Sequence, residues 1–242
     1  MKKYPGQKKI NGLYHKIINQ IPKHEVYYEI FAGTGAIGKL LIEQNCKAYY
    51  YFNDIDTKIA EQLYSELITN AKHQILKSEI SIWNNRAGII LTQLRLQDYK
   101  HKILGNSFVF IDAPYLLSTR HSNTPVYSHE FTDLDHKQLL LQLPKLNCNI
   151  MVVHPECEVY DKHLKGWRKV LVKVRYNNKT SIDCLYMNYE EPKLLQTDAF
   201  LGKDCWDRQR IKRKSDNLIK KLKALPDLER KFIIKRVLEN VA

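Results

Sequence analysis

The 242-residue sequence lacks the patterns that identify several classes of protein. No run approaches the roughly 20 consecutive apolar residues of a membrane-spanning helix. The basic start, MKKYPGQKK, is followed by no apolar stretch, so we do not expect a signal peptide. The five cysteines are scattered, with no Cys-x-x-Cys pair and no histidine at ligand spacing. This usage predicts reduced thiols, a cytoplasmic protein and no metal site.

Acidic residues are fewer than basic ones. The chain has 26 Asp and Glu against 39 Lys and Arg, which gives a net charge of +13. Residues 203–242 hold thirteen of the basic residues and six of the acidic ones, so this segment alone carries +7. A domain this basic suggests a polyanion as partner, although a Lys-rich protein without such a partner would have the same composition.

The sequence does contain an alternation of strand and helix patterns. Short apolar and aromatic runs at 26–31, 48–52, 79–83, 108–111 and 149–153 predict strands, and helical spacing recurs between them. This order predicts an α/β fold with a doubly wound parallel sheet, and runs at 169–175 and 182–189 predict a final hairpin. Two amphipathic patterns follow, the second starting at Pro226. We therefore expect a catalytic domain over residues 1–200 and a basic helical extension over 201–242.

The run 108–111 ends in Asp112-Ala113-Pro114-Tyr115. Because a proline cannot continue a central strand, the chain must turn out of the sheet there. A carboxylate, a carbonyl and an aromatic ring are then presented at the carboxyl end of a strand, which is the edge where open α/β sheets bind ligands. An ordinary strand end with an Asp turn would have the same local sequence.

Two further features are expected at the same edge. The first strand runs into a glycine turn, Phe31-Ala32-Gly33-Thr34-Gly35, which is followed by a helix. Gly33 and Gly35 allow the backbone to approach a ligand closely, and the helix start offers free N–H groups. Asp54 lies about 20 residues later, where dinucleotide-binding folds place the carboxylate that holds a ribose.

Together these motifs resemble those of the Dam-like, phage-rich family of DNA adenine N6-methyltransferases, which use S-adenosylmethionine. The resemblance covers roughly residues 4–190. Tyr4-Pro5-Gly6-Gln7-Lys8 is similar to the family's N-terminal cofactor motif, 31–35 matches its glycine motif, and 112–115 is similar to its Asp-Pro-Pro-Tyr motif. Further matches are Ser118, Thr119, Arg120, Tyr127, Glu130, Phe131, Asp135, His136, Tyr160, Asp161, Gly166 and Trp167.

The resemblance implies a Rossmann-like methyltransferase sheet that transfers a methyl group to adenine N6 in DNA after the base is flipped out. It implies that Asp112, Ala113, Pro114 and Tyr115 are catalytic. It assigns cofactor binding to Tyr4, Gly6, Lys8, Phe31, Ala32, Gly33, Thr34, Gly35, Asp54 and Asp112. Two positions depart from the family pattern: Ala113 replaces its first proline, and Arg86 stands where it has an acidic residue.

DNA contacts are expected in two places, because the interval between Gly35 and Asp112 has no room for a separate target-recognition domain. Arg120, His121 and Tyr127 could contact bases from the loop 116–129, although a solvated loop is an equal interpretation. A cluster in the tail predicts phosphate contacts, against the alternative of a solvated helix face. These tail residues are Arg208, Arg210, Lys212, Arg213 and Lys214.

Two alternatives to a DNA adenine methyltransferase stay open at this point. The chain could be a catalytically weak or inactive relative that binds DNA or cofactor, because Ala113 interrupts the catalytic motif. It could also methylate cytosine N4, RNA adenine or a protein glutamine. Asp112 disfavours this second alternative by family analogy, since those groups have Ser or Asn at the corresponding place.

Overall fold

The computed structural model describes residues 12–44, 48–69, 80–101, 105–120, 126–176, 179–198, 200–202 and 204–241. The chain divides into two units, residues 1–197 and 198–242. The expected N-terminal cofactor motif at residues 4–8, the loop residue His121 and the turn at Asn177 and Asn178 lie outside the described residues.

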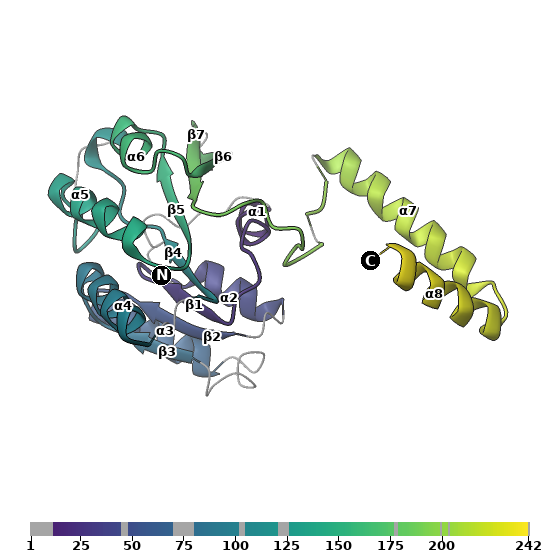
Figure 1. Cartoon of the computed structure of the whole chain (residues 1–242). Helices are drawn as coiled ribbons and strands as arrows, with labels where there is room; N and C mark the ends of the chain where they lie inside the picture. The colour runs from purple at the N-terminus through teal and green to yellow at the C-terminus, as the bar shows by residue number, and fades with distance from the viewer. Residues whose placement is uncertain are drawn as a thin grey trace. The chain divides into compact units, whose positions relative to one another are not determined.

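Within the described residues of the first unit, seven strands form one sheet (Figure 1). They are β1 (Val26–Glu29), β2 (Tyr49–Asn53), β3 (Ile80–Trp83), β4 (Ser107–Ile111), β5 (Asn149–Pro155), β6 (Arg168–Tyr176) and β7 (Lys179–Met187). Their spatial order is β3-β2-β1-β4-β5-β7-β6. The first five pair in parallel, whereas β7 is antiparallel to both β5 and β6. The α/β, Rossmann-like fold class predicted from the sequence is confirmed.

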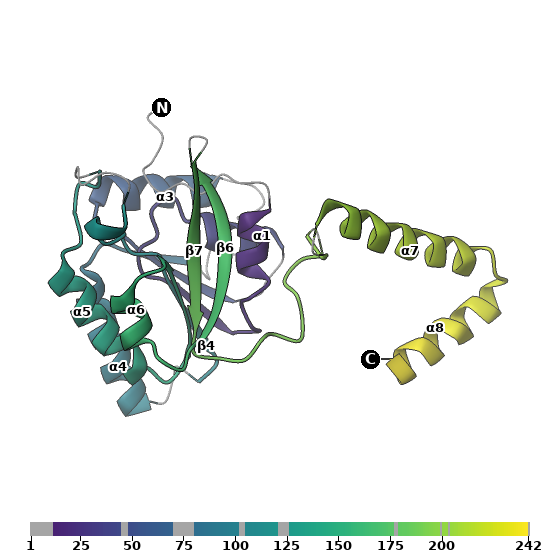
Figure 2. The same cartoon turned by 90° about the horizontal axis from the view of Figure 1, so that it is seen from above.

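Helices cover both faces of this sheet. The helices α1 (Leu13–Ile18), α2 (Ala36–Glu43) and α3 (Thr57–Thr69) pack on one face. The helices α4 (Ala87–His101), α5 (Asp133–Gln142) and α6 (Glu158–His163) pack on the other, and Figure 2 shows these three together on one side. Short 3₁₀ turns at η2 (Leu117–Thr119) and η3 (Leu143–Lys145) precede and follow α5.

The strand β4 shows why the central runs are apolar throughout. All five of its residues are buried. Phe108 and Phe110 join the core under α1, α2 and α3, whereas Val109 and Ile111 join the core under α4, α5 and α6. A strand buried on both faces cannot alternate polar and apolar residues, and it therefore has the continuous apolar run by which it was predicted.

The order of the strands fixes where a ligand can bind. The chain builds β1, β2 and β3 outward in one direction and then returns to place β4 on the other side of β1. The carboxyl ends of β1 and β4 therefore diverge into loops on opposite faces, which creates a crevice at this topological switch point.

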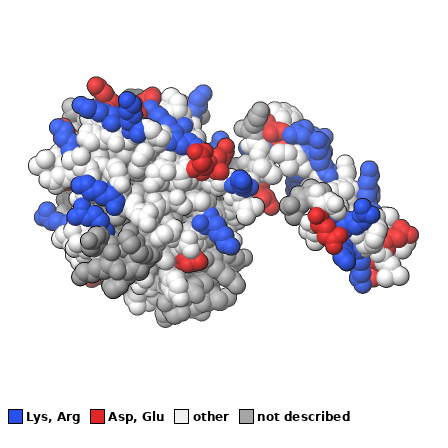
Figure 3. Space-filling view, viewed as in Figure 1, with Lys and Arg blue, Asp and Glu red and all other residues white. Residues whose placement is uncertain are grey.

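The second unit contains α7 (Cys205–Lys223) and α8 (Asp227–Val241). The helix α7 begins at a side-chain cap, because the Asp204 carboxylate accepts a hydrogen bond from the Asp207 backbone N–H at 2.8 Å. The expected apolar stripe is present, but no described residue of α7 is buried. Leu218 is 59% exposed and Phe232 is 60% exposed. Figure 3 shows Lys and Arg side chains gathered over α7.

Candidate active site

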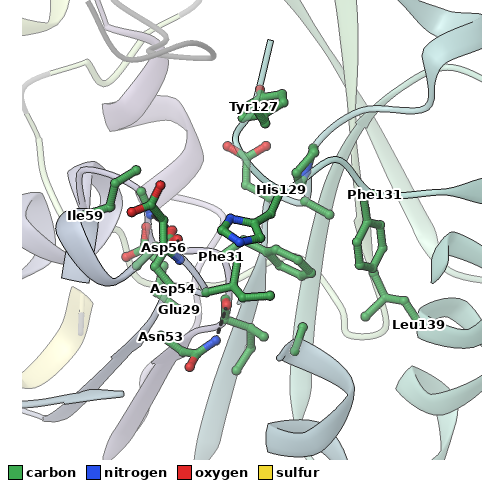
Figure 4. Close-up of a pocket in the computed structure, with 18 of the residues that line it drawn as sticks. Glu29, Phe31, Asn53, Asp54, Asp56, Ile59, Tyr127, His129, Phe131 and Leu139 are labelled. Carbon is green, nitrogen blue, oxygen red and sulfur yellow. Dashed lines mark hydrogen bonds between the residues drawn. The ribbon is translucent and has the colours of Figure 1, made fainter. Parts of the chain in front are cut away.

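A cavity of about 650 Å³ lies at the switch point, over the carboxyl ends of β1, β2 and β4 (Figure 4). Four loops that follow strands line it, at 30–34, 54–56, 85–88 and 112–115. The segment 126–131 and the inner face of α5 complete the wall. The structure thus brings together most of the residues predicted for the cofactor and catalytic sites. These are Phe31, Ala32, Gly33, Thr34, Asp54, Asp112, Ala113, Pro114 and Tyr115.

The glycine turn has the backbone shape that its residues predict. Gly33 has a φ of 51° and Gly35 has a φ of 64°, a left-handed conformation that side chains with a Cβ rarely adopt. Gly35 does not line the cavity itself, but it forms the N-cap of α2. Position 38, one helical turn further on, requires glycine for a different reason, which is lack of space for a side chain. A Cβ there would lie 2.4 Å from the Phe52 ring and 2.9 Å from Glu29 Oε2.

Glu29, at the end of β1, is a site residue that the sequence analysis missed. Its side chain lines the cavity, yet the residue is only 3% exposed. The Glu29 Oε2 atom accepts hydrogen bonds from the Gly38 backbone N–H at 3.0 Å and from the Tyr27 hydroxyl at 3.1 Å. Burial raises the pKa of the Glu29 carboxyl to about 8, and the nearby Asp112 carboxylate acts in the same direction.

Asp54 connects the β2 loop to the glycine turn. One carboxylate oxygen accepts a hydrogen bond from the Gly33 backbone N–H at 2.8 Å, and the other accepts from the Asp56 backbone N–H at 2.9 Å. Burial raises the pKa of Asp54, and these two backbone N–H groups oppose the shift because they stabilise the charged form. Since each carboxylate oxygen has two lone pairs, Asp54 can hold the turn and still accept from a ligand.

The end of β3 is tied to β2 by asparagine side chains. The Asn53 amide donates to the carbonyls of Ile30 at 3.0 Å and Asn85 at 2.9 Å, and its oxygen accepts from the Asn85 N–H at 3.0 Å. Asn84 donates to the Asp54 carbonyl at 2.8 Å. Arg86 lines the cavity beside Asn85, so one of the two residues that depart from the family pattern lies here.

The turn after β4 presents Asp112 half-buried and Ala113 fully buried at the cavity wall. The Tyr115 ring lies edge-on to the His154 ring, with 5.3 Å between centroids. The Tyr115 hydroxyl donates to Asp183 Oδ2 at 2.9 Å. These contacts fix the place of the Tyr115 ring, and both Tyr115 and Asp112 line the cavity.

The segment 126–131 closes one side of the cavity, and its contacts were not foreseen. The Ser128 hydroxyl donates to Asp56 Oδ2 at 2.7 Å, across 72 residues of sequence. Phe131 meets Phe31 edge-on at 5.3 Å between ring centroids. Figure 4 shows His129 between Asp56 and Phe31, in the middle of the site. A contact between a loop and a distant strand end has no local sequence signal.

Of the three predicted base contacts in the loop, two are described. The Arg120 guanidinium donates to both Glu130 oxygens at 3.0 and 2.7 Å, and its Nε donates to the Tyr115 carbonyl at 2.7 Å. This pair lowers the pKa of Glu130 to about 2. Tyr127 lines the cavity, and the Arg120 guanidinium lies 5.3 Å from its ring centroid. The geometry thus gives Arg120 contacts within the protein, and its contact with a base stays a prediction.

The cavity is acidic in a chain that is strongly basic. Arg86 is the only Lys or Arg that lines it in the part of the chain that the structure describes. Six acidic residues line it: Glu29, Asp54, Asp56, Asp112, Glu130 and Asp135. Glu29 is mostly protonated at neutral pH and Glu130 pairs with Arg120, yet acidic side chains still outnumber basic ones in the lining. Such a site favours a ligand that carries positive charge. No group of three or more His, Cys, Asp or Glu side chains among the described residues is placed to hold a metal ion, and no described helix is long and apolar enough to cross a membrane.

No protein-family model matches the chain, and no curated protein matches it. Similar solved structures include TrmK of M. capricolum, in complex with the natural cofactor product S-adenosyl-homocysteine, at 13% identity over 93% of this chain and 92% of that one, with a TM-score of 0.46. Sp1610 of Streptococcus pneumoniae, a proposed tRNA (m1A22) methyltransferase, has 16% identity over 95% and 96%, with a TM-score of 0.45. Precorrin-6y C5,15-methyltransferase of Geobacter metallireducens has 10% identity over 79% and 93%, with a TM-score of 0.46. Likenesses this weak say nothing of the substrate.

Proposed function

We propose that this protein is an S-adenosylmethionine-dependent methyltransferase that acts on the N6 amino group of adenine in DNA. One observation carries the proposal: the acidic cavity at the switch point joins a glycine turn, a strand-end carboxylate and the Asp112–Tyr115 turn. The motif resemblance and the lining of the cavity both support the proposal.

The cofactor half of the cavity suits S-adenosylmethionine, because this molecule carries a positive sulfonium and an ammonium group. Asp112 offers negative charge near the glycine turn, Glu29 can ionise when a cation binds beside it, and Asp54 offers an acceptor for a ribose hydroxyl. The close approach at Gly38 keeps Glu29 in place under the turn. When bound, the cofactor supplies an activated methyl group, and the protein's task is to align the acceptor and exclude water.

The acceptor half of the cavity suits an amino group attached to an aromatic base. Adenine N6 is a weak nucleophile because its lone pair is delocalised into the ring. The Asp112 carboxylate and the Ala113 carbonyl can each accept one amino hydrogen, which favours a tetrahedral nitrogen with an available lone pair. The Tyr115 ring supplies a stacking surface for the base. In duplex DNA the target must be flipped out of the stack to reach these groups.

The basic tail is proposed to bind the phosphate backbone. Its helix α7 carries the predicted cluster 208–214, and the apolar residues between the charges do not form a buried core in the described residues of this unit. Phosphate contacts of this kind fix the position of the nucleic acid and carry no sequence information of their own.

The proposal is tested by substituting Asp112. Asp112→Ala removes one preorganised acceptor, which typically costs a hundredfold or more in turnover. S-adenosylmethionine affinity, measured by calorimetry, is expected to change much less. Asp133→Ala is the matched control, because Asp133 is exposed and does not line the cavity. Wild-type turnover in Asp112→Ala would refute the assignment.

A further inference from the structure

Residues 112–115 of the turn 112–116 line the cavity. Side chains that do not line the cavity form hydrogen bonds with the polar groups of Tyr115 and Leu116. The Tyr115 hydroxyl donates to Asp183 on β7 at 2.9 Å, and the Leu116 N–H donates to His154 Nε2 on β5 at 3.1 Å. The Tyr115 carbonyl accepts from Arg120 Nε at 2.7 Å. Asp183 and His154 are at most 1% exposed, and none of the three partners lines the cavity. They contact the turn and not the cavity.

Each of these partners is itself fixed. His154 Nδ1 lies 2.7 Å from the Pro155 carbonyl, so this nitrogen carries the hydrogen and Nε2 is left to accept from Leu116. The His154 ring stacks on Tyr160, with 3.8 Å between centroids and 9° between planes. Arg120 is fixed by its two hydrogen bonds to Glu130. A bond to a fixed partner removes freedom from the turn, which a bond to a mobile surface group would not do.

The turn requires such outside support. The pyrrolidine ring fixes φ at Pro114 and disfavours helical geometry at Ala113, but Ala113 has no ring that fixes its own φ. The proposed reaction requires the Ala113 carbonyl and the Tyr115 ring to be in place before the base arrives, because an acceptor that must reorganise loses part of its effect on the transition state. The three partners add restraints to those that Pro114 places on the backbone.

We propose that Asp183, with His154 and Arg120, positions the catalytic turn, and that Asp183 does so by fixing the Tyr115 ring through its hydroxyl. This inference rests on the proposed function for its catalytic meaning. Asp183, His154 and Arg120 are positioning residues, because they touch the turn and not the reacting groups.

The restraint is tested first without any assay of activity. In the full-length protein, Tyr115→Phe keeps the ring and removes only the hydroxyl. We expect amide hydrogen exchange of residues 112–120 to become at least about tenfold faster, while β4 keeps its protection. Tyr186→Phe is the matched control, because the Tyr186 hydroxyl also donates to a carboxylate at 2.9 Å, that of Asp161 on α6. Unchanged exchange at 112–120 in Tyr115→Phe would overturn the proposal.

Kinetics then test whether the restraint serves catalysis. We expect Tyr115→Phe to lower kcat about tenfold and to leave the Kd for S-adenosylmethionine within about twofold of the wild type. Asp183→Asn keeps an acceptor oxygen and should lose much less than Asp183→Ala. If exchange rises in Tyr115→Phe but kcat does not fall, the positioning role is wrong. If the wild type methylates no nucleic acid, the proposed function fails. The hydrogen-exchange result then decides by itself whether the Tyr115–Asp183 hydrogen bond restrains the turn.

Discussion

The substitution Glu29→Gln tests the electrostatics of the site. The carboxyl has a pKa of about 8 in the folded chain because it is buried, against about 4.5 when unfolded. Between these two pH values the unfolded chain has released a proton that the folded chain retains. The free energy of unfolding therefore falls as pH rises through this window, by about 1.4 kcal/mol per pH unit. The contribution of Glu29 is fully present below pH 4.5 and is lost above about pH 8, a total of up to about 5 kcal/mol.

Glutamine at position 29 has nearly the same shape and cannot titrate. Its amide oxygen can still accept from the Gly38 N–H and the Tyr27 hydroxyl, so we expect the variant to fold. Urea unfolding of both proteins, measured between pH 5 and pH 8, should show wild-type stability falling relative to the variant as pH rises. Parallel stability curves across this range would refute the buried, protonated state of Glu29.

The same variant probes the ligand. If a cationic cofactor binds beside Glu29, the carboxyl must ionise on binding, and this costs about tenfold in affinity for each pH unit below 8. Calorimetry should find that wild-type affinity for S-adenosylmethionine rises relative to Glu29→Gln from pH 6 to pH 8. An identical pH profile for the two proteins would place the positive groups of the cofactor away from Glu29.

Three other changes have defined outcomes. Asp54→Ala should weaken S-adenosylmethionine binding about ten- to a hundredfold by calorimetry, since a hydrogen bond to a charged group is lost; an unchanged Kd would shift the ribose contact to Asp56. Ala113→Pro should raise the rate of methyl transfer, because it restrains the carbonyl acceptor and favours extended geometry at Asp112; a lower rate would mean that the turn has another shape. Neutralising the tail cluster to Gln should flatten the salt dependence of DNA binding by about 0.9 in the log–log slope for each lost phosphate contact, with cofactor affinity unchanged; a folded variant with the wild-type slope would exclude the tail as the clamp. The residues changed together are Arg208, Arg210, Lys212, Arg213 and Lys214.

Much of the sheet and part of the site could be predicted from the sequence, because both follow from local patterns. The buried run 108–111 and the glycine turn after β1 each have a short signature, and the topology of parallel strands then brings Gly33, Asp54 and Asp112 to one edge. The helix α6 was not foreseen, because its six residues are too few to show a helical period. The helices of the tail were predicted from the sequence. The exposure of their apolar faces could not be predicted from it.

Residues that act through distant partners were not found from sequence. Glu29 did have a signal: a carboxylate within an otherwise apolar, buried strand must have partners. Ser128 and Asp183 had none, because they meet Asp56 and Tyr115 across 72 and 68 residues. Arg120 was interpreted as a base contact from its place in a polar loop, and its pairing with Glu130 depends on how that loop folds.

The central claim is the identity of the methyl acceptor, and one measurement addresses it directly. The purified full-length protein is incubated with S-adenosylmethionine and with DNA or RNA in parallel, and the nucleosides are then analysed by mass spectrometry. We predict N6-methyladenine in the DNA, formed at least about a hundredfold more slowly by Asp112→Ala. Methylation of RNA alone, of cytosine N4, or of no nucleoside would contradict the account.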